Sequence, residues 1–107
     1  MNIQEMMKQA KVMQTRMEEM QRKMGDMEVA GESGGGVVKV TMTCKGEVRA
    51  LTIAPEVILP DDKETLEDLV KAAVNMARKN ADQRVTDETQ RMMKEFGLPT
   101  DFQLPDM

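Results

Sequence analysis

Apolar residues recur at alternating intervals of three and four through the first quarter of the chain: Ile3, Met6, Ala10, Met13, Met17, Met20, Met24 and Met27. This spacing predicts a helix over residues 2–24 with a narrow apolar seam of the coiled-coil type. We expect Asn2 and Glu5 to cap the helix and Gly25 to end it. A helix of about 33 Å is too long for so short a chain to cover. A second copy of the chain is therefore expected to complete a thin core.

The pattern changes from helical to alternating between residues 27 and 54. Residues 27–32 predict a short strand, and the glycine-rich residues 33–36 a hairpin connection; a phosphate-binding loop would precede a helix instead. Alternating apolar and polar residues over 38–45 predict a second, half-buried strand. A third strand follows over residues 47–54, where Leu51 and Ile53 share one face. Val48 joins that face only if a bulge lies near Arg49–Ala50.

Helical spacing returns after the third strand. Residues 55–59 predict one helical turn, and Asp61 or Asp62 is expected to cap a second helix. Gly97 is expected to end this helix in a left-handed conformation, with Leu98 folding back on Met93. Its buried stripe is expected at Leu66, Leu69, Val70, Ala73, Ala77, Ala81, Arg84 and Val85.

Together these elements predict an α+β fold with a long N-terminal helix, a three-stranded antiparallel meander, a helical turn and a long C-terminal helix. Residues 1–99 are expected to form a single domain. Residues 100–107 show no periodicity, so we expect a disordered tail there.

The composition excludes several kinds of chemistry. The chain contains 13 Met but no His, Trp or Tyr, so it lacks imidazole triads and the usual general base of neutral pH. The single cysteine, Cys44, alternates with core residues and is expected to be a buried thiol, which suits a reducing cytoplasm. The methionines are spaced for packing, and the acidic residues 61–68 suit helix capping better than a calcium loop. We therefore predict a non-enzymatic protein with no cofactor, metal or small-molecule substrate.

No run of residues approaches the roughly 20 apolar positions that a membrane-spanning helix needs. The sequence also begins without the charged and apolar regions of a signal peptide. We expect a cytoplasmic protein with no membrane partner.

Charge is distributed unevenly along the chain, whose net charge is −4. Residues 1–24 contain five basic and three acidic residues, and residues 69–94 contain six basic and three acidic ones. Acidic residues concentrate in the segment 55–68 instead. A basic helix attracts phosphate even on an acidic protein, because a nearby phosphate responds to the local electrostatic field and not to the net charge of the protein. A solvated helix face with pairs such as Glu18 and Arg22 would give the same pattern.

Two blocks of sequence resemble the YbaB/EbfC nucleoid-associated proteins. The first runs from Val29 to Val40 (VAGESGGGVVKV) and follows the MKQA sequence of residues 7–10. The second runs from Asp61 to Val70 (DDKETLEDLV), after LTIAPE at residues 51–56. The resemblance covers nearly the whole chain. One difference is that this sequence lacks the Gly-rich, Phe-containing N-terminal lead that many members carry.

The resemblance implies a bacterial cytoplasmic protein that forms a tweezer-shaped homodimer. Its sheets would associate at the centre, and its long helices would protrude as arms that grip duplex DNA. Such proteins bind DNA with limited sequence preference, alter its conformation and influence gene expression.

The residue pattern and the resemblance lead to one set of candidate DNA contacts, which are basic residues of the two helices expected to face phosphates. They are Lys8, Lys11, Arg16, Arg22 and Lys23 of the first helix, and Arg78, Lys79, Arg84 and Arg91 of the second. Contacts of this kind weaken steeply as salt rises. The alternative is a protein–protein interaction module that uses the Met-rich seam and does not bind DNA directly.

Overall fold

The computed structural model describes residues 2–97 and confirms the α+β fold. Helix α1 (Ile3–Asp26) is followed by strands β1 (Glu28–Ser33), β2 (Val38–Thr43) and β3 (Val48–Ile53). Two short 3₁₀ turns, η1 (Pro55–Val57) and η2 (Pro60–Asp62), lead into helix α2 (Lys63–Glu95). The expectations for Leu98 and for the tail 100–107 lie outside the described residues.

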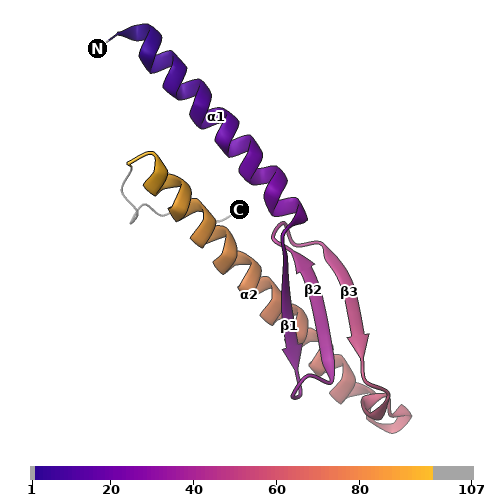
Figure 1. Ribbon diagram of the computed structural model, residues 1–107. Coiled ribbons are helices and arrows are strands. Elements are labelled where there is room, and N and C mark those ends of the chain that lie inside the picture. Colours follow the sequence, from indigo (N-terminus) through magenta and orange to yellow (C-terminus); the bar gives the residue numbers. More distant parts are fainter. Residues whose placement is uncertain (1, 98–107) are drawn as a thin grey trace.

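The molecule is elongated, with principal extents of 71 × 23 × 18 Å and a radius of gyration of 19.2 Å. A compact domain of this length has a radius of gyration of about 13 Å. Figure 1 shows the reason: α1 and α2 run antiparallel and extend together beyond one end of the sheet. The sheet covers only the N-terminal half of α2.

The core lies between α2 and one face of the sheet, whose strand order is β1-β2-β3 with antiparallel neighbours. Its buried side chains are Val38, Val40 and Met42 of β2 and Ala73, Ala77 and Ala81 of α2. The small alanine side chains let the helix approach the strands closely. Gly31 of β1 completes this contact, because a Cβ built on it would lie 2.3 Å from the backbone nitrogen of Ala77.

The expected bulge in the third strand is confirmed. Thr41 pairs with Ala50 and Met42 pairs with Val48, so Arg49 is the extra residue. Opposed residues share a face of the sheet; hence Val48 and Leu51 face the same side as the core residues Met42 and Val40. Both are about half exposed, at 48% and 49%, because α2 lies over the other two strands.

The caps and turns were predicted in part. The Asn2 side chain accepts a hydrogen bond from the Gln4 amide at 3.0 Å, and Gly97 has the left-handed φ of 68°. The glycine-rich segment forms the hairpin between β1 and β2, with positive φ at three successive glycines. Asp62 precedes α2, but its carboxylate accepts from the Thr65 hydroxyl at 2.7 Å and makes no hydrogen bond to a backbone amide.

Two details of the helices were predicted wrongly. Gly25 does not end α1, which continues to Asp26 before Met27 becomes extended. Arg84 does not belong to the buried stripe of α2, since its side chain is 50% exposed. By that point α2 has passed the edge of the sheet, and its neighbour is α1.

The apolar seam of α1 is covered in part, and it is most deeply buried near the sheet. Met24 is buried and Met13 and Met20 are half-buried, whereas Met6 and Met17 are 51% and 45% exposed. This chain therefore leaves half of the eight seam positions exposed, as the length of the helix led us to expect.

Candidate nucleic-acid interface

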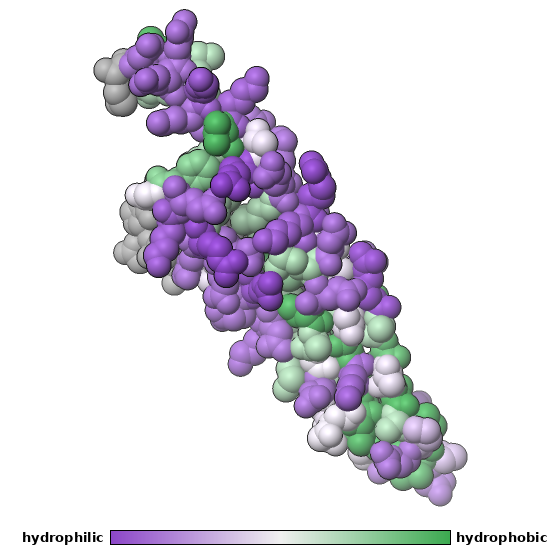
Figure 2. All heavy atoms as spheres, in the orientation of Figure 1, coloured by the Kyte–Doolittle hydropathy of each residue, from purple (hydrophilic) through white to green (hydrophobic). Residues whose placement is uncertain are grey.

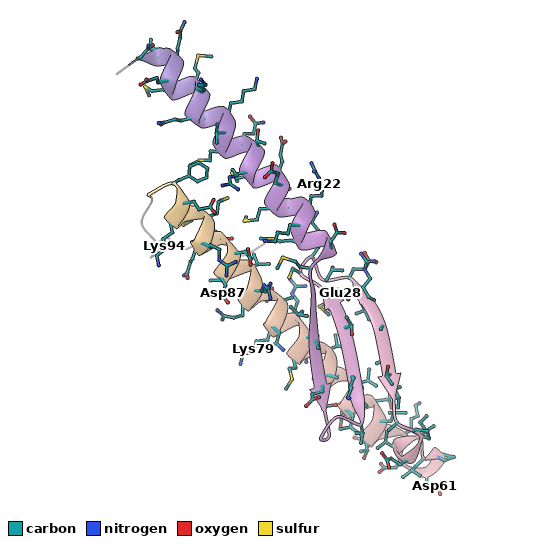
Figure 3. The ribbon with its side chains drawn as sticks, in the orientation of Figure 1. Arg22, Glu28, Asp61, Lys79, Asp87 and Lys94 are labelled. Atoms are coloured by element: carbon teal, nitrogen blue, oxygen red, sulfur yellow. The ribbon has the colours of Figure 1, made fainter. Side chains whose placement is uncertain are left out.

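Three of the candidate basic residues of α1 share its outer face. At 100° per residue, Lys8, Lys11 and Arg22 fall opposite the methionine seam, and all three are exposed. Figure 3 shows Arg22 on the side of α1 turned away from α2. None of the three pairs with a carboxylate of residues 2–97. Their charges are available to an external anion as far as the described chain is concerned.

The other two candidates of α1 face α2 instead. Arg16 forms an ion pair with Glu95 at 2.9 Å, and Lys23 forms one with Glu88 at 3.4 Å. Because Glu95 is the last residue of α2, the turns of α1 before Arg16 extend past the end of that helix. Lys8 and Lys11 lie on this projecting part.

Glu88 is the centre of an ion-pair cluster that the sequence did not reveal. Its side chain is only 7% exposed, yet it contacts three cations. Arg91 Nη1 lies 3.1 Å and Arg84 Nε 3.5 Å from Glu88 Oε1, while Lys23 Nζ lies 3.4 Å from Oε2. Arg84 lies four residues before Glu88 and Arg91 three residues after it. This helical spacing of opposite charges is the feature of the sequence that indicated ion pairs here.

A cleft of about 150 Å³ lies between the two helices next to this cluster. Its charged lining is balanced. Three basic residues, Arg16, Lys23 and Arg91, face three acidic ones, Glu19, Glu88 and Glu95. The interior of the cleft therefore has no net attraction for a phosphate group.

The remaining candidates lie on the middle of α2. Arg78 pairs with Asp82 at 3.2 Å, one helical turn further on. Lys79 is exposed, and Figure 3 shows it on the side of α2 away from α1. The nine candidates thus fall into three groups: the outer face of α1, the surroundings of the cleft, and the middle of α2.

The buried thiol of Cys44 lies close enough to the cluster to feel its charges. Burial raises the pKa of Cys44 above its ordinary value of 9.0; the Arg84 cation opposes this rise and the Glu88 carboxylate adds to it. The thiol is therefore protonated at neutral pH, as expected for a structural cysteine.

Hydrophobic and hydrophilic surfaces separate along the molecule. Figure 2 shows apolar residues gathered over the sheet end and hydrophilic residues over the projecting helices. Within residues 2–97, no three His, Cys, Asp or Glu side chains come together in a way that could hold a metal ion. No helix in the same range combines the length and apolar character needed to cross a bilayer.

The fold is similar to that of a solved structure, the uncharacterized protein HP0035 from Helicobacter pylori. The TM-score is 0.73 at 22% sequence identity, over 87% of this chain and 98% of that one. At this identity the likeness shows a shared fold. A family model described as the YbaB/EbfC DNA-binding family matches residues 1–96, which is most of the chain. With its helix, meander and helix in this arrangement, the chain belongs to the YbaB/EbfC DNA-binding family.

Proposed function

We propose that this protein binds duplex DNA as a homodimer, through phosphate contacts and with limited sequence preference. It carries out no catalysis, and it acts in the bacterial cytoplasm as part of the nucleoid, where it alters DNA conformation and influences gene expression. The observation that carries the proposal is the exposed row of Lys8, Lys11 and Arg22 on a projecting helix, in a member of a DNA-binding family.

The residue types favour contacts with the backbone of DNA over contacts with its bases. Neither α1 nor α2 contains an aromatic residue on which a base could stack. Long, flexible lysine side chains suit phosphate as point charges, and such contacts position a protein without reading sequence. Limited sequence preference follows from this arrangement.

The dimer is supported by apolar surface at the open edge of the sheet. Val48 and Leu51 of β3 are about half exposed, and Ile58 and Leu59 beyond it are 55% and 53% exposed. An apolar edge strand that nothing covers tends to associate with another chain. A second copy seated here would leave the α1 helices of both copies projecting as arms.

A titration of random-sequence duplex at several salt concentrations tests DNA binding. The wild type should bind with an affinity that falls as salt rises. The double variant Lys8→Glu, Lys11→Glu leaves two fewer phosphates neutralised per chain, so the slope of log K against log salt should shrink by about 0.9 for each of them.

The matched control is Lys63→Glu with Lys71→Glu, which makes the same charge change at exposed positions near the other end of the molecule. It should bind nearly as well as the wild type. Equal weakening by both double variants would show that net charge alone matters and would contradict the proposed interface.

Sedimentation at micromolar concentration tests the dimer. Wild type should sediment at twice the chain mass of 12.1 kDa, and Leu51→Lys should shift it toward that single-chain mass. A wild-type mass near 12.1 kDa would contradict the homodimer.

A second candidate function is supported by the open seam of α1, where Ile3 is 73% exposed and Met6 51%. Methionine-lined surfaces adapt to different partner helices. In that case the chain would be an interaction module, and its DNA affinity would be absent or indifferent to salt and to the Lys8 and Lys11 substitutions.

A further inference from the structure

Glu88 is unusual among the acidic residues of the helices because it is almost fully buried. Its carboxylate is 7% exposed, whereas the side chains of its partners Lys23, Arg84 and Arg91 are 50–68% exposed. A desolvated carboxylate is costly unless it stays paired. Each of the three cations therefore contacts the buried Glu88 carboxylate on one side and is exposed to water on the other.

The cluster joins parts of the chain that are far apart in sequence. Lys23 belongs to α1, and its Nζ reaches Glu88 of α2 across a separation of 65 residues. Within the described chain, Glu88 is the one acidic residue that pairs with any of the three cations. A single buried negative charge thus gathers three positive ones, and the cluster keeps an excess of two positive charges.

From this geometry we infer that Glu88 is a positioning residue that holds Lys23, Arg84 and Arg91 together as one phosphate-binding cluster spanning both helices. The inference rests on the proposed DNA binding. A guanidinium has five N–H donors. The shorter of the two arginine contacts to Glu88, from Nη1 of Arg91 at 3.1 Å, uses one nitrogen of the guanidinium. The other donors remain for a phosphodiester on the exposed outer side.

The phosphate would lie outside the cleft and not within it. Inside, Glu19, Glu88 and Glu95 balance the basic residues, so a phosphate gains nothing by entering. Outside, the exposed parts of Lys23, Arg84 and Arg91 face the solvent while the Glu88 carboxylate is buried beneath them, which favours an anion there. Holding long side chains in place before binding also reduces the entropy lost when the phosphate arrives.

The inference and simple charge counting predict opposite results for Glu88→Gln. Removing a negative charge from a protein of net charge −4 should strengthen DNA binding if only charge matters. If Glu88 positions the three cations, its removal lets them separate, and binding weakens. With one fewer phosphate neutralised per chain, the salt slope would shrink by about 0.9 for each chain that contacts the DNA, and each such loss is about an eightfold decrease in affinity at 0.1 M salt.

Asp87→Asn is the matched control. Asp87 is the preceding residue, carries the same charge and is exposed; its carboxylate accepts a hydrogen bond from Gln83 and contacts none of the three cations. Asp87→Asn should bind DNA as tightly as the wild type or more tightly, with an unchanged slope. Circular dichroism of both variants checks that the fold is intact.

Lys23→Gln covers the case in which Glu88→Gln does not fold. Lys23 is well exposed, and its removal leaves Glu88 paired with both arginines. Its salt slope should also fall by about 0.9 for each chain that contacts the DNA. When Glu88→Gln and Lys23→Gln are combined, the loss of DNA-binding free energy should be smaller than the sum of the two separate losses, since both substitutions disrupt one cluster.

The outcomes separate the two proposals. If wild type shows no salt-dependent binding, the proposed function fails and the inference fails with it. If wild type binds but Glu88→Gln matches Asp87→Asn, or Lys23→Gln keeps the wild-type slope, the positioning role is overturned and DNA binding stands. Weaker binding with a smaller slope in Glu88→Gln and Lys23→Gln, but not in Asp87→Asn, supports the inference.

Discussion

The close approach of Gly31 in β1 to the backbone of α2 predicts a large effect for one added methyl group, Gly31→Ala. An ideal Cβ at Gly31 would lie 2.3 Å from the nitrogen of Ala77 and 2.4 Å from the carbonyl oxygen of Ala73. These are backbone atoms of a helix, so no side chain can rotate away to make room. An ordinary contact begins near 3.4 Å, which means that β1 and α2 must separate by about 1.1 Å.

A separation of this size loosens the whole core between helix and sheet. A gap of roughly 1 Å loses up to about half of the dispersion energy of the atoms that face it. Val40 and Ala73 lie at this interface and are fully buried. Overpacking of a core costs about 1–3 kcal/mol, and we expect the upper end here because both sides are backbone.

Thermal unfolding followed by circular dichroism measures the effect. For a domain of this size 1 kcal/mol corresponds to about 4–8 °C, so Gly31→Ala should melt about 12–24 °C lower. Gly25→Ala is the matched control, because its Cβ would meet nothing closer than Lys45 at 3.7 Å. In a helix that change should stabilise by up to about 1 kcal/mol. Both variants must be compared at one protein concentration, since association shifts the midpoint.

Equal melting temperatures for Gly31→Ala and wild type would refute this reasoning. They would mean that Gly31 lies further from Ala77 than the 2.3 Å between its built Cβ and the Ala77 nitrogen implies, or that β1 and α2 can move apart without loss of stability. A melting temperature raised in both variants would point to the loss of unfolded-state entropy as the dominant effect.

Two further predictions concern the thiol and the projecting helix. Burial raises the pKa of the Cys44 thiol, so the folded protein holds this proton more tightly than the unfolded chain does. The resulting stabilisation is fully present below pH 9.0 and declines as pH rises above it. Urea unfolding at pH 8 and pH 10 should show this decline in wild type but not in Cys44→Ser, and equal decreases in both proteins would contradict it. Residues 3–12 of α1 are all exposed, so their amides should exchange hydrogen much faster than those of β2, and added duplex DNA should slow them. Protection equal to that of β2 in the free protein would instead show that another chain already covers this helix.

Local patterns were enough to predict the elements and even one irregularity in them. The bulge at Arg49 followed from the sequence because Val48 and Leu51 are out of phase by one position, and only an extra residue puts both on one face. The hairpin glycines and Gly97 were predictable for a similar reason, since each occupies a left-handed conformation that other residues rarely adopt.

The errors occur where one element meets another. Gly25 resembles a helix stop, but α1 continues through it to Asp26. Arg84 follows Ala81 by three residues and so falls on the same helix face as Ala77 and Ala81, yet its side chain is 50% exposed. Periodicity describes one helix face and does not report how far the neighbouring sheet extends.

The buried role of Glu88 could not be predicted for a related reason. Its arginine neighbours at positions 84 and 91 are common spacings for surface ion pairs, which are worth little. What makes Glu88 different is its burial and its contact with Lys23, and both depend on the approach of α1 to α2. The candidate site was therefore predicted as a set of basic residues, without the acidic residue that connects three of them.

The position of the acidic residues explains how a protein of net charge −4 can attract a polyanion. The segment 55–68 contains six acidic residues and one lysine, and Figure 3 places Asp61 at the end of the molecule opposite the projecting helices. At 0.1 M salt the field of an exposed charge decays over about 10 Å, whereas the molecule is 71 Å long. In the proposed binding mode, acidic residues at one end are therefore screened from DNA at the other, and the basic face of α1 would determine the interaction there. Lower salt lengthens this range, so the acidic end should begin to oppose binding below about 0.01 M, where the screening length reaches about 30 Å.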